Sequence, residues 1–524
     1  MKIAPFLQLT LALWITGAIE AAEKPNIIVI LVDDMGFSDI GCYGGEIPTP
    51  HLDQLAAGGL RFTQFYNTGR CCPTRASLLT GLYPHQTGVG HMNDDNGVPG
   101  YRGRLNEQCV TLAEVLRPAG YFTAMTGKWH VGQEHGVTPS SRGFERSLNA
   151  GAGGFYYPGS PRANLFLNGE TLQRKNGKLP DDWYSTDLWT DFGIKFIDQA
   201  LTAKQPFFLY LAHNAPHFPL QAPQDEIAKF RGKFKAGWDK LRDQRHAKQL
   251  ELGIVDQQWP MAERPKEVQA WNDLSADEQE RFDHIMAIYA ATIAHMDRSV
   301  GRLVASLKER GVFDNTLILF MSDNGGNAES GPEGILNGNP PGSETSNVFQ
   351  GQSWATLSNT PFRRYKHYNH EGGIATPLIA HWPAGIKAHG ELRRQPGHLV
   401  DIMATCADVG GAGYPKEFKG HAIVPMEGTS LVPAFGGQPL KRDTLYWEHE
   451  GNAAVRVGDR KLVRLGRSGK WELYDLKSDR TEAHDLAAAN PDEVKQLAAN
   501  WDAWAARAQV KPRSNGGKGG KAKP

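Results

Sequence analysis

Four short apolar segments, each followed directly by a polar cluster, constrain the fold of this chain more than any other feature. They span residues 26–32, 121–126, 207–212 and 316–321. Continuous apolar runs of this length are typical of strands that are buried on both faces, as in a parallel sheet. Helical patterns alternate with them, and the clearest, over residues 277–310, carries one apolar stripe. The sequence therefore predicts an α/β fold with a mostly parallel sheet.

The pattern changes near residue 440, where short strands joined by glycine-containing turns are predicted. Candidate strands cover residues 444–448, 453–457, 461–465 and 471–476, and an alanine-rich helix follows over 491–508. We therefore expect a smaller C-terminal α+β domain built on a short antiparallel sheet. The predicted parts of the chain are a signal peptide (1–22), a large domain (23–438), the C-terminal domain (439–510) and a disordered tail (511–524).

The first residues read as a secretory signal peptide. Met1-Lys2 precedes an apolar run over residues 3–19, and Ala21 and Ala22 are candidate cleavage points. A membrane anchor is the alternative, but the run is short for a span and Pro5 interrupts it. We expect export to a periplasm or secretion from the cell, with no membrane span in the mature protein.

Charge and cysteine content narrow the class of protein further. Lys plus Arg and Asp plus Glu both number 57, so no basic excess points to nucleic acid. Five cysteines are too few for a disulfide scaffold in an exported chain of this length, and their odd number leaves at least one unpaired or modified. The oligomeric state is left open by the sequence.

Carboxylates follow two of the four apolar runs. Asp33 and Asp34 follow the first run, and Asp323 and Asn324 follow the fourth. Ligands in open α/β sheets bind outside the carboxyl ends of the strands, so these side chains are expected to converge. Two carboxylates about 4 Å apart repel by about 4 kcal/mol at an effective dielectric of about 20, and a divalent cation removes that cost. An all-oxygen set favours Ca²⁺ or Mg²⁺ over zinc, although a cap or solvated turn is the alternative for Asp33-Asp34 alone.

Cationic and imidazole groups complete the strand-end clusters. Lys128 and His130 follow the second run, His217 follows the third, and Arg75 and Lys366 lie in other segments. Each taken alone is more often a surface charge or a satisfied histidine. Placed together beside a cation, they could surround a doubly charged tetrahedral oxyanion and supply general acids and bases.

The stretch over residues 69–81 combines a thiol, an arginine and a helix start. Pro73 suits the first turn of a helix, where free N–H groups and the dipole favour an anion. Cys71 and Arg75 then share one face of that turn. A buried cysteine pair is the alternative, because free cysteine usually acts as a small hydrophobe. A hard cation suits a thiolate poorly, so an oxygen-bearing derivative of Cys71 would fit better.

This stretch resembles the type I sulfatase signature of the alkaline-phosphatase superfamily. The matching residues are Cys71-x-Pro73-Thr74-Arg75 with Leu79-Thr80-Gly81. The resemblance extends from about Pro25 to Leu486 and includes Asp33-Asp34, Gly127-Lys128-Trp129-His130, Ala215-Pro216-His217-x-Pro219, Ser322-Asp323-Asn324-Gly325-Gly326 and Lys366 ahead of Glu371-Gly372-Gly373. It implies a large mixed sheet sandwiched by helices and a catalytic sulfatase domain over residues 23–438.

The resemblance implies that a maturation enzyme oxidises Cys71 to Cα-formylglycine and leaves Cys72 unmodified. One hydroxyl of the hydrated aldehyde would attack sulfur and displace the alcohol, and the other would then expel sulfate. The ligands implied for Ca²⁺ are the formylglycine oxygen at Cys71 and the side chains of Asp33, Asp34, Asp323 and Asn324.

Roles for the remaining residues follow from the same resemblance. Arg75, Lys128 and Lys366 would neutralise the sulfate and the diol. His130 would activate the diol hydroxyl, and His217 or Lys366 would protonate the leaving oxygen. The implied substrate is an aryl sulfate or a sulfated carbohydrate.

Two other functions compete with this hypothesis. One is a phosphodiesterase or phosphonate monoester hydrolase of the same superfamily, and the other is a non-catalytic glycan-binding protein. Residues 225–275, residues 325–360 and the C-terminal domain are expected to shape the rim of the pocket. Their tryptophans either stack on a sugar or aryl ring or belong to the core; they are Trp238, Trp259, Trp271 and Trp354.

Overall fold

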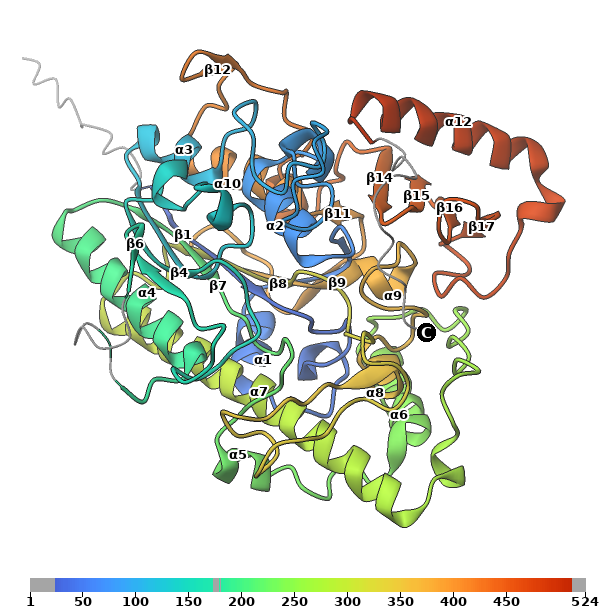
Figure 1. Ribbon diagram of the computed structural model, residues 1–524. Coiled ribbons are helices and arrows are strands. Elements are labelled where there is room, and N and C mark those ends of the chain that lie inside the picture. Colours follow the sequence, from blue (N-terminus) through green and yellow to red (C-terminus); the bar gives the residue numbers. More distant parts are fainter. Residues whose placement is uncertain (1–23, 173–178, 180, 511–524) are drawn as a thin grey trace, which may run out of the picture.

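The computed structural model describes residues 24–172, 179 and 181–510, so the predicted signal peptide and tail lie outside the described residues. A large sheet forms the centre of the molecule (Figure 1). Its strands are β1 (Asn26–Val32), β2 (Leu60–Tyr66), β3 (Phe122–Lys128), β4 (Arg146–Ala150), β5 (Leu165–Leu167), β6 (Glu170–Thr171), β7 (Phe207–Ala212), β8 (Thr316–Ser322), β9 (Ala375–His381), β10 (Glu391–Arg393) and β11 (Gly397–His398).

The four predicted apolar runs form the middle of this sheet. They are adjacent in the order β3-β7-β1-β8, and every pair in that order is parallel. Ile28 of β1 lies opposite Leu209 of β7 and Ile318 of β8. Strand β9 is antiparallel to both β8 and β2. The predicted large, mixed and mostly parallel sheet is therefore confirmed.

Helices cover both faces of the sheet, with α1, α4 and α7 on one side and α2, α3 and α10 on the other (Figure 1). The helices are α1 (Pro50–Ala57), α2 (Cys71–Thr80), α3 (Leu112–Leu116), α4 (Ser185–Thr202), α5 (Gln224–Ala228), α6 (Gly237–Glu251), α7 (Ala276–Glu309), α8 (Gly351–Ser358), α9 (Glu371–Ile374), α10 (Asp401–Gly410), α11 (Val432–Phe435) and α12 (Pro491–Arg507).

Strand β1 shows why its sequence is apolar at every position. Ile28 and Ile30 belong to the core that contains Ile293 of α7, whereas Val29 belongs to the core that contains Leu78 of α2. Successive side chains of a strand point to opposite faces, so both faces of β1 are buried. No helix in the described part of the chain has the length and apolar character needed to cross a bilayer.

The C-terminal region forms a second, smaller sheet. Strands β14 (Thr444–His449), β15 (Asn452–Val457), β16 (Arg460–Arg464) and β17 (Trp471–Asp475) pair in this order, all antiparallel. Helix α12 packs on this sheet, where Trp504 stacks on Tyr446 at 5.0 Å between ring centres. A separate short hairpin joins β12 (Glu417–Phe418) to β13 (His421–Ala422). The predicted boundary at residue 438 falls between α11 and β14 and stays a prediction.

Buried ion pairs join the small sheet to the large domain. Lys461 of β16 lies 2.8 Å from Glu371 and 2.8 Å from Glu482, and all three side chains are fully buried. Arg480 lies 2.9 Å from the same Glu371 carboxylate. Removing one partner of such a pair leaves a buried charge without a counter-ion, which destabilises the fold. The stability of this junction therefore depends on all of the paired residues.

The two segments that were expected to shape the pocket rim, residues 225–275 and 325–360, pack against each other. Residues 225–275 contain α6 and residues 325–360 contain α8, and these two helices pack on each other. The four tryptophans that were candidates either for stacking on a sugar or for the core are all buried in the core. They are Trp238, Trp259, Trp271 and Trp354. Three of them form one aromatic cluster that links α6 to α8, in which Trp238 meets Trp271 and Trp354 edge to face. In this chain, a tryptophan within a charged segment therefore does not indicate a ring that is exposed at the surface.

Candidate active site

The carboxyl ends of the four central strands bring the predicted site residues together. Asp33 and Asp34 follow β1, Asp323 and Asn324 follow β8, and Lys128 ends β3. Parallel neighbours end at the same edge of a sheet, so residues distant in sequence meet there. The backbone N–H of Asp34 donates a hydrogen bond to Asp323 Oδ1 at 3.2 Å.

The buried carboxylates are balanced by cations. Lys128 Nζ lies 2.6 Å from Asp33 Oδ2, and Arg75 Nη2 lies 2.8 Å from Asp323 Oδ2 and 3.4 Å from Asp33 Oδ2. Lys366 Nζ lies 2.9 Å from Asp34 Oδ1. Although burial opposes it, Lys128 and the neighbouring His217 and Arg75 hold the pKa of Asp33 well below its usual value. Burial and the Asp33 carboxylate hold the pKa of Asp323 well above its usual value.

Two oxygens of this cluster are buried without any hydrogen-bond partner. They are Asp33 Oδ1 and Asn324 Oδ1. The amide nitrogen of Asn324 donates to Asp34 Oδ1 at 2.8 Å, which leaves its carbonyl oxygen available. Buried oxygens of this kind are normally satisfied, so a missing partner is implied. Free carboxylate and amide oxygens suit a hard cation such as Ca²⁺, and the residues present therefore fit such an ion.

Cys71 is the first residue of α2 and is 1% exposed. Arg70 precedes it with extended backbone, and Gly81 closes the helix in the left-handed conformation at φ 72°. The helix was predicted to begin here, and its free N-terminal N–H groups favour an anion beside Cys71. A hydrogen bond from Cys72, together with Lys128 and His130, lowers the pKa of the Cys71 thiol well below its usual value, although burial opposes this.

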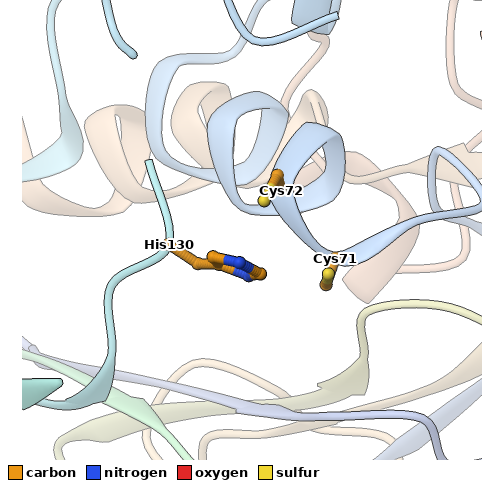
Figure 2. A group of neighbouring side chains, drawn as sticks. All are labelled: Cys71, Cys72 and His130. Carbon is orange, nitrogen blue, oxygen red and sulfur yellow. The ribbon is translucent and has the colours of Figure 1, made fainter. Parts of the chain in front are cut away.

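His130 faces the sulfur atoms of Cys71 and Cys72. Figure 2 shows its imidazole pointing from the segment after β3 toward Cys71 and Cys72. Ligand-type atoms of all three residues lie within 4.8 Å of one another. Burial, with the charge of Lys128, lowers the pKa of His130 to about 4, so its imidazole is neutral near pH 7. Cys72 donates to Asn93 Oδ1 at 3.2 Å, and burial raises the pKa of its thiol.

His217 and Lys366 approach Asp34 from other segments. His217 Nε2 lies 3.7 Å from Asp34 Oδ2, and its ring stacks on Phe218 at 4.3 Å between centres. Burial lowers the pKa of His217. Asp34 and Glu329 raise the pKa of Lys366 against the opposing effect of burial, so this lysine stays charged.

A cavity of about 670 Å³ opens over these groups. Cys71, Lys128, His130, His217 and Lys366 line it, whereas Arg75 is fully buried and contacts the carboxylates instead. The sequence reasoning missed the residues that form the rest of the wall. They include Arg70, Asn93, Gln133, Arg162, Phe166, Phe218 and Glu329.

The rim is built from other segments than expected. Its residues lie at 92–93, 133–134 and 151–166, together with Phe218. Among the residues described, residues 225–275 and the C-terminal domain supply no side chain to the wall, and residues 325–360 supply only Glu329. The sequence signal that could have indicated the loop at residues 151–166 is its glycine-rich start at 151–154.

Comparisons with known proteins show which family the chain belongs to. A family model described as sulfatase matches residues 25–412, and a model of the C-terminal part of N-sulphoglucosamine sulphohydrolase matches residues 363–503. An uncharacterized sulfatase of Schizosaccharomyces pombe is 34% identical, over 92% of this chain and 93% of its own. An arylsulfatase of Klebsiella aerogenes is 37% identical, over 80% of this chain and 94% of its own. The crystal structure of Ps i-CgsB in complex with k-i-k-neocarrahexaose is 27% identical, with a TM-score of 0.67 and coverage of 92% of this chain and 93% of that chain.

Proposed function

Since the chain belongs to the sulfatase family and is a sulfuric ester hydrolase, we propose that it releases sulfate from an aryl sulfate or a sulfated carbohydrate by means of a formylglycine formed from Cys71. The observation that carries this proposal is the position of Cys71. It lies at the N-terminus of α2, at the cavity wall, with Lys128, His130 and Lys366 lining the same cavity. Such a setting favours a tetrahedral oxyanion bound against the side chain of residue 71.

Asp33, Asp34, Asp323 and Asn324 are the residues that would hold Ca²⁺, and Mg²⁺ is the alternative ion. The unpartnered oxygens of Asp33 and Asn324 support this assignment. The ion would supply positive charge beside the reacting group. Formylglycine, once formed by a maturation enzyme, supplies a hydrated aldehyde with one hydroxyl for attack on sulfur and a second for release of sulfate.

The proposed roles of the neighbouring residues follow from their charge. Lys128 faces the cavity as a cation and offsets the charge of the sulfate group. Arg75 is buried between Asp33 and Asp323 and holds both carboxylates in position. His130 is neutral near pH 7 because its pKa is about 4, so it can accept a proton from the hydroxyl at residue 71.

His217 and Lys366 are both candidates for the proton donor to the leaving oxygen. Lys366 holds its proton tightly, because Asp34 and Glu329 raise its pKa, and it therefore suits charge neutralisation. His217 lines the cavity, but burial lowers its pKa and so disfavours the protonated form that a donor needs.

The cavity wall supports a substrate with both polar and ring-shaped parts. Asn93, Gln133 and Arg162 offer hydrogen bonds, and Phe166 offers an aromatic ring, whereas the Phe218 ring is already stacked on His217 and Phe349. The Klebsiella aerogenes relative is named an arylsulfatase, and the Ps i-CgsB crystal structure holds a neocarrahexaose. Both substrate classes are therefore retained. We also propose that the protein is exported, with residues 1–22 as its signal peptide.

Two measurements test the proposal. Mass spectrometry of the peptide that carries Cys71, from protein made with a maturation enzyme, is expected to show formylglycine at residue 71 and an intact Cys72. A preparation with only thiol at residue 71 and full sulfatase activity would contradict it. Comparison of kcat/KM for an aryl sulfate and an aryl phosphonate separates the sulfatase from the phosphonate hydrolase, and turnover of either excludes a non-catalytic glycan-binding protein.

A further inference from the structure

A second group of ligand-type side chains lies beside the catalytic cavity and takes no part in the proposed reaction. It comprises His91, His367, His449 and Glu450, which we call the histidine cluster. We propose that the histidine cluster binds a divalent transition metal such as Zn²⁺ and thereby fastens the C-terminal domain to the rim of the cavity.

The four residues come from three distant segments. His91 follows the 3₁₀ helix Pro84–Thr87, and His367 lies in the turn before α9. His449 ends β14, and Glu450 begins the turn to β15 with a left-handed φ of 54°. An ion bound to all four would join the small C-terminal sheet to two loops of the large domain.

The carboxylate of Glu450 is the centre of the histidine cluster. Its Oε1 lies 3.3 Å from His91 Nε2 and 3.7 Å from His449 Nε2, and its Oε2 lies 2.8 Å from His367 Nδ1. Ligand atoms at about 2.0–2.2 Å from a tetrahedral ion are roughly 3.3–3.6 Å apart. The spacing of the polar atoms is therefore close to that of a ligand set.

The spacing of the imidazole rings agrees. The ring centres of His91 and His449 lie 5.5 Å apart, and those of His367 and His449 lie 6.1 Å apart. Two imidazoles bound to one tetrahedral ion have centres roughly 5 Å apart. Donor atoms of His367, His449 and Glu450 all lie within 4.8 Å of one another. His91 lies outside that group of three and is linked to it by its 3.3 Å contact with Glu450, so it is the ligand that would have to move most.

His449 supplies an independent indication of a missing ligand. Its side chain is fully buried, and both of its ring nitrogens lack a hydrogen-bond partner. A buried polar group without a partner costs about 1–3 kcal/mol, and native structures rarely retain one. A metal ion at Nε2 would satisfy the nitrogen that faces Glu450.

Glu329 orients one of the imidazoles. His367 Nε2 lies 2.8 Å from Glu329 Oε1, so the proton at Nε2 donates to that carboxylate. The lone pair is then on Nδ1, which lies 2.8 Å from Glu450 Oε2 and also contacts Arg70, so a bound ion would displace that guanidinium. A carboxylate that holds the far nitrogen of a metal-binding histidine is a common feature of metal sites.

Arg70 is the cation nearest to the cluster and could oppose a metal ion. It contacts His367, lies 3.1 Å from Glu329 Oε1 and lies 3.9 Å from Glu450 Oε1. The two carboxylates outnumber this guanidinium, so the group carries a net charge of −1 with neutral imidazoles. The nearby Lys366 lies 3.4 Å from Glu329 Oε2, but its closer partner is Asp34 at 2.9 Å, and adding this lysine and this carboxylate together leaves the count at −1. The local charge therefore still favours a divalent cation.

The two candidate metal sites differ in chemistry. Three imidazole nitrogens and one carboxylate suit Zn²⁺ or Co²⁺, whereas the all-oxygen cluster at Asp33 suits Ca²⁺. Excess Ca²⁺ is thus expected to fill the catalytic cluster and leave the histidine cluster open to a transition metal. This difference makes the sites separable in one titration.

The test is a Co²⁺ titration of the full-length protein, stripped with chelator and reloaded with excess Ca²⁺. We expect one equivalent of Co²⁺ to bind with the visible d–d spectrum of nitrogen and oxygen ligands. His449→Ala and Glu450→Gln are expected to weaken binding at least about 100-fold, and Glu329→Gln about 10–100-fold. His484→Ala is the matched control, because His484 is 73% exposed and lies outside the cluster.

Circular dichroism of each variant in Ca²⁺ reports whether it is folded. If His449→Ala does not fold, Glu450→Gln decides, because the Glu450 side chain is 34% exposed and lies in a turn. The proposal is overturned if wild type binds no Co²⁺ or if the two ligand variants bind it as wild type does. A thiolate-to-cobalt charge-transfer band would place the ion at Cys71 and Cys72 and overturn it as well. Sulfatase turnover, measured separately with Ca²⁺ alone, tests the proposed function independently.

Discussion

Replacing Lys128 with methionine tests whether its charge serves the reaction. The change keeps the length of the side chain and removes one positive charge at the cavity wall. A unit charge about 4 Å from the transferred group is worth about 4 kcal/mol at an effective dielectric of about 20. That energy corresponds to a loss in kcat/KM on the order of 10³-fold.

The same substitution also affects stability. Lys128 Nζ lies 2.6 Å from Asp33 Oδ2, and among the described residues Arg75 at 3.4 Å would then remain as the direct partner of that oxygen. Removing one member of a buried pair costs about 3–5 kcal/mol in the free energy of unfolding. Activity must therefore be compared per folded molecule, with Ca²⁺ present, after urea unfolding has measured the stability.

Lys461→Met is the matched control. Lys461 is also fully buried between carboxylates, Glu371 and Glu482, but it lies at the domain junction and outside the cavity wall. We expect a similar loss of stability and kcat/KM within about threefold of wild type per folded molecule. The reasoning fails if Lys461→Met loses as much activity as Lys128→Met, or if Lys128→Met keeps more than a tenth of wild-type kcat/KM.

Three further predictions concern the nucleophile, the ion and pH. Cys71→Ala is expected to reduce sulfate release at least about 10⁴-fold, whereas Cys72→Ala is expected to stay within a few-fold of wild type. Equal losses in the two variants, measured with an aryl sulfate, would mean that Cys71 is not the precursor of the nucleophile. Chelation is expected to remove most activity, and added Ca²⁺ or Mg²⁺ to restore it; full activity in a protein shown by elemental analysis to be metal-free would refute the ion's role. The free energy of unfolding is expected to fall by several kcal/mol between about pH 6.5 and pH 4. Burial lowers the pKa of both His213 and His398 to about 3 in the folded protein, so the unfolded chain takes up those protons at a higher pH. Urea unfolding midpoints that rise as the pH falls would contradict this prediction.

The sheet could be predicted because its signal is local. A strand buried on both faces must be apolar at every position, and β1 and β7 have the bounds that their sequences predict. The polar cluster after each strand then follows from chain order and parallel pairing. The start of α2 was predicted from Pro73, which suits the first turn of a helix, and the helix begins two residues earlier, at Cys71.

The cavity wall could not be predicted in the same way. Arg162 and Phe166 belong to a loop and an edge strand whose place depends on packing against distant segments. The tryptophans of residues 225–275 show the converse limit, since composition does not separate a core ring from an exposed one. Arg75 was grouped with the sulfate-binding cations, and its burial between Asp33 and Asp323 appears only when three segments are assembled.

Backbone conformation supplies the last element that the sequence hides. Asp34 and His130 both have a left-handed φ, at 67° and 58°, which is uncommon for residues other than glycine. Each is the second residue after the end of a central strand, where a left-handed residue turns the chain sharply. Such strain costs about 1–3 kcal/mol per residue and persists only where the surroundings hold it. Asp34 is held by its N–H bond to Asp323 and by Lys366, so the carboxylate cluster itself maintains the turn that forms it. Asp34→Gly would relax the backbone but remove a predicted ion ligand, whereas Asp34→Asn keeps an oxygen and tolerates the left-handed conformation. Asn is therefore expected to retain more of the Ca²⁺ affinity than Gly, as measured by calorimetric titration, and the reverse order would show that strain, not ligation, governs this position.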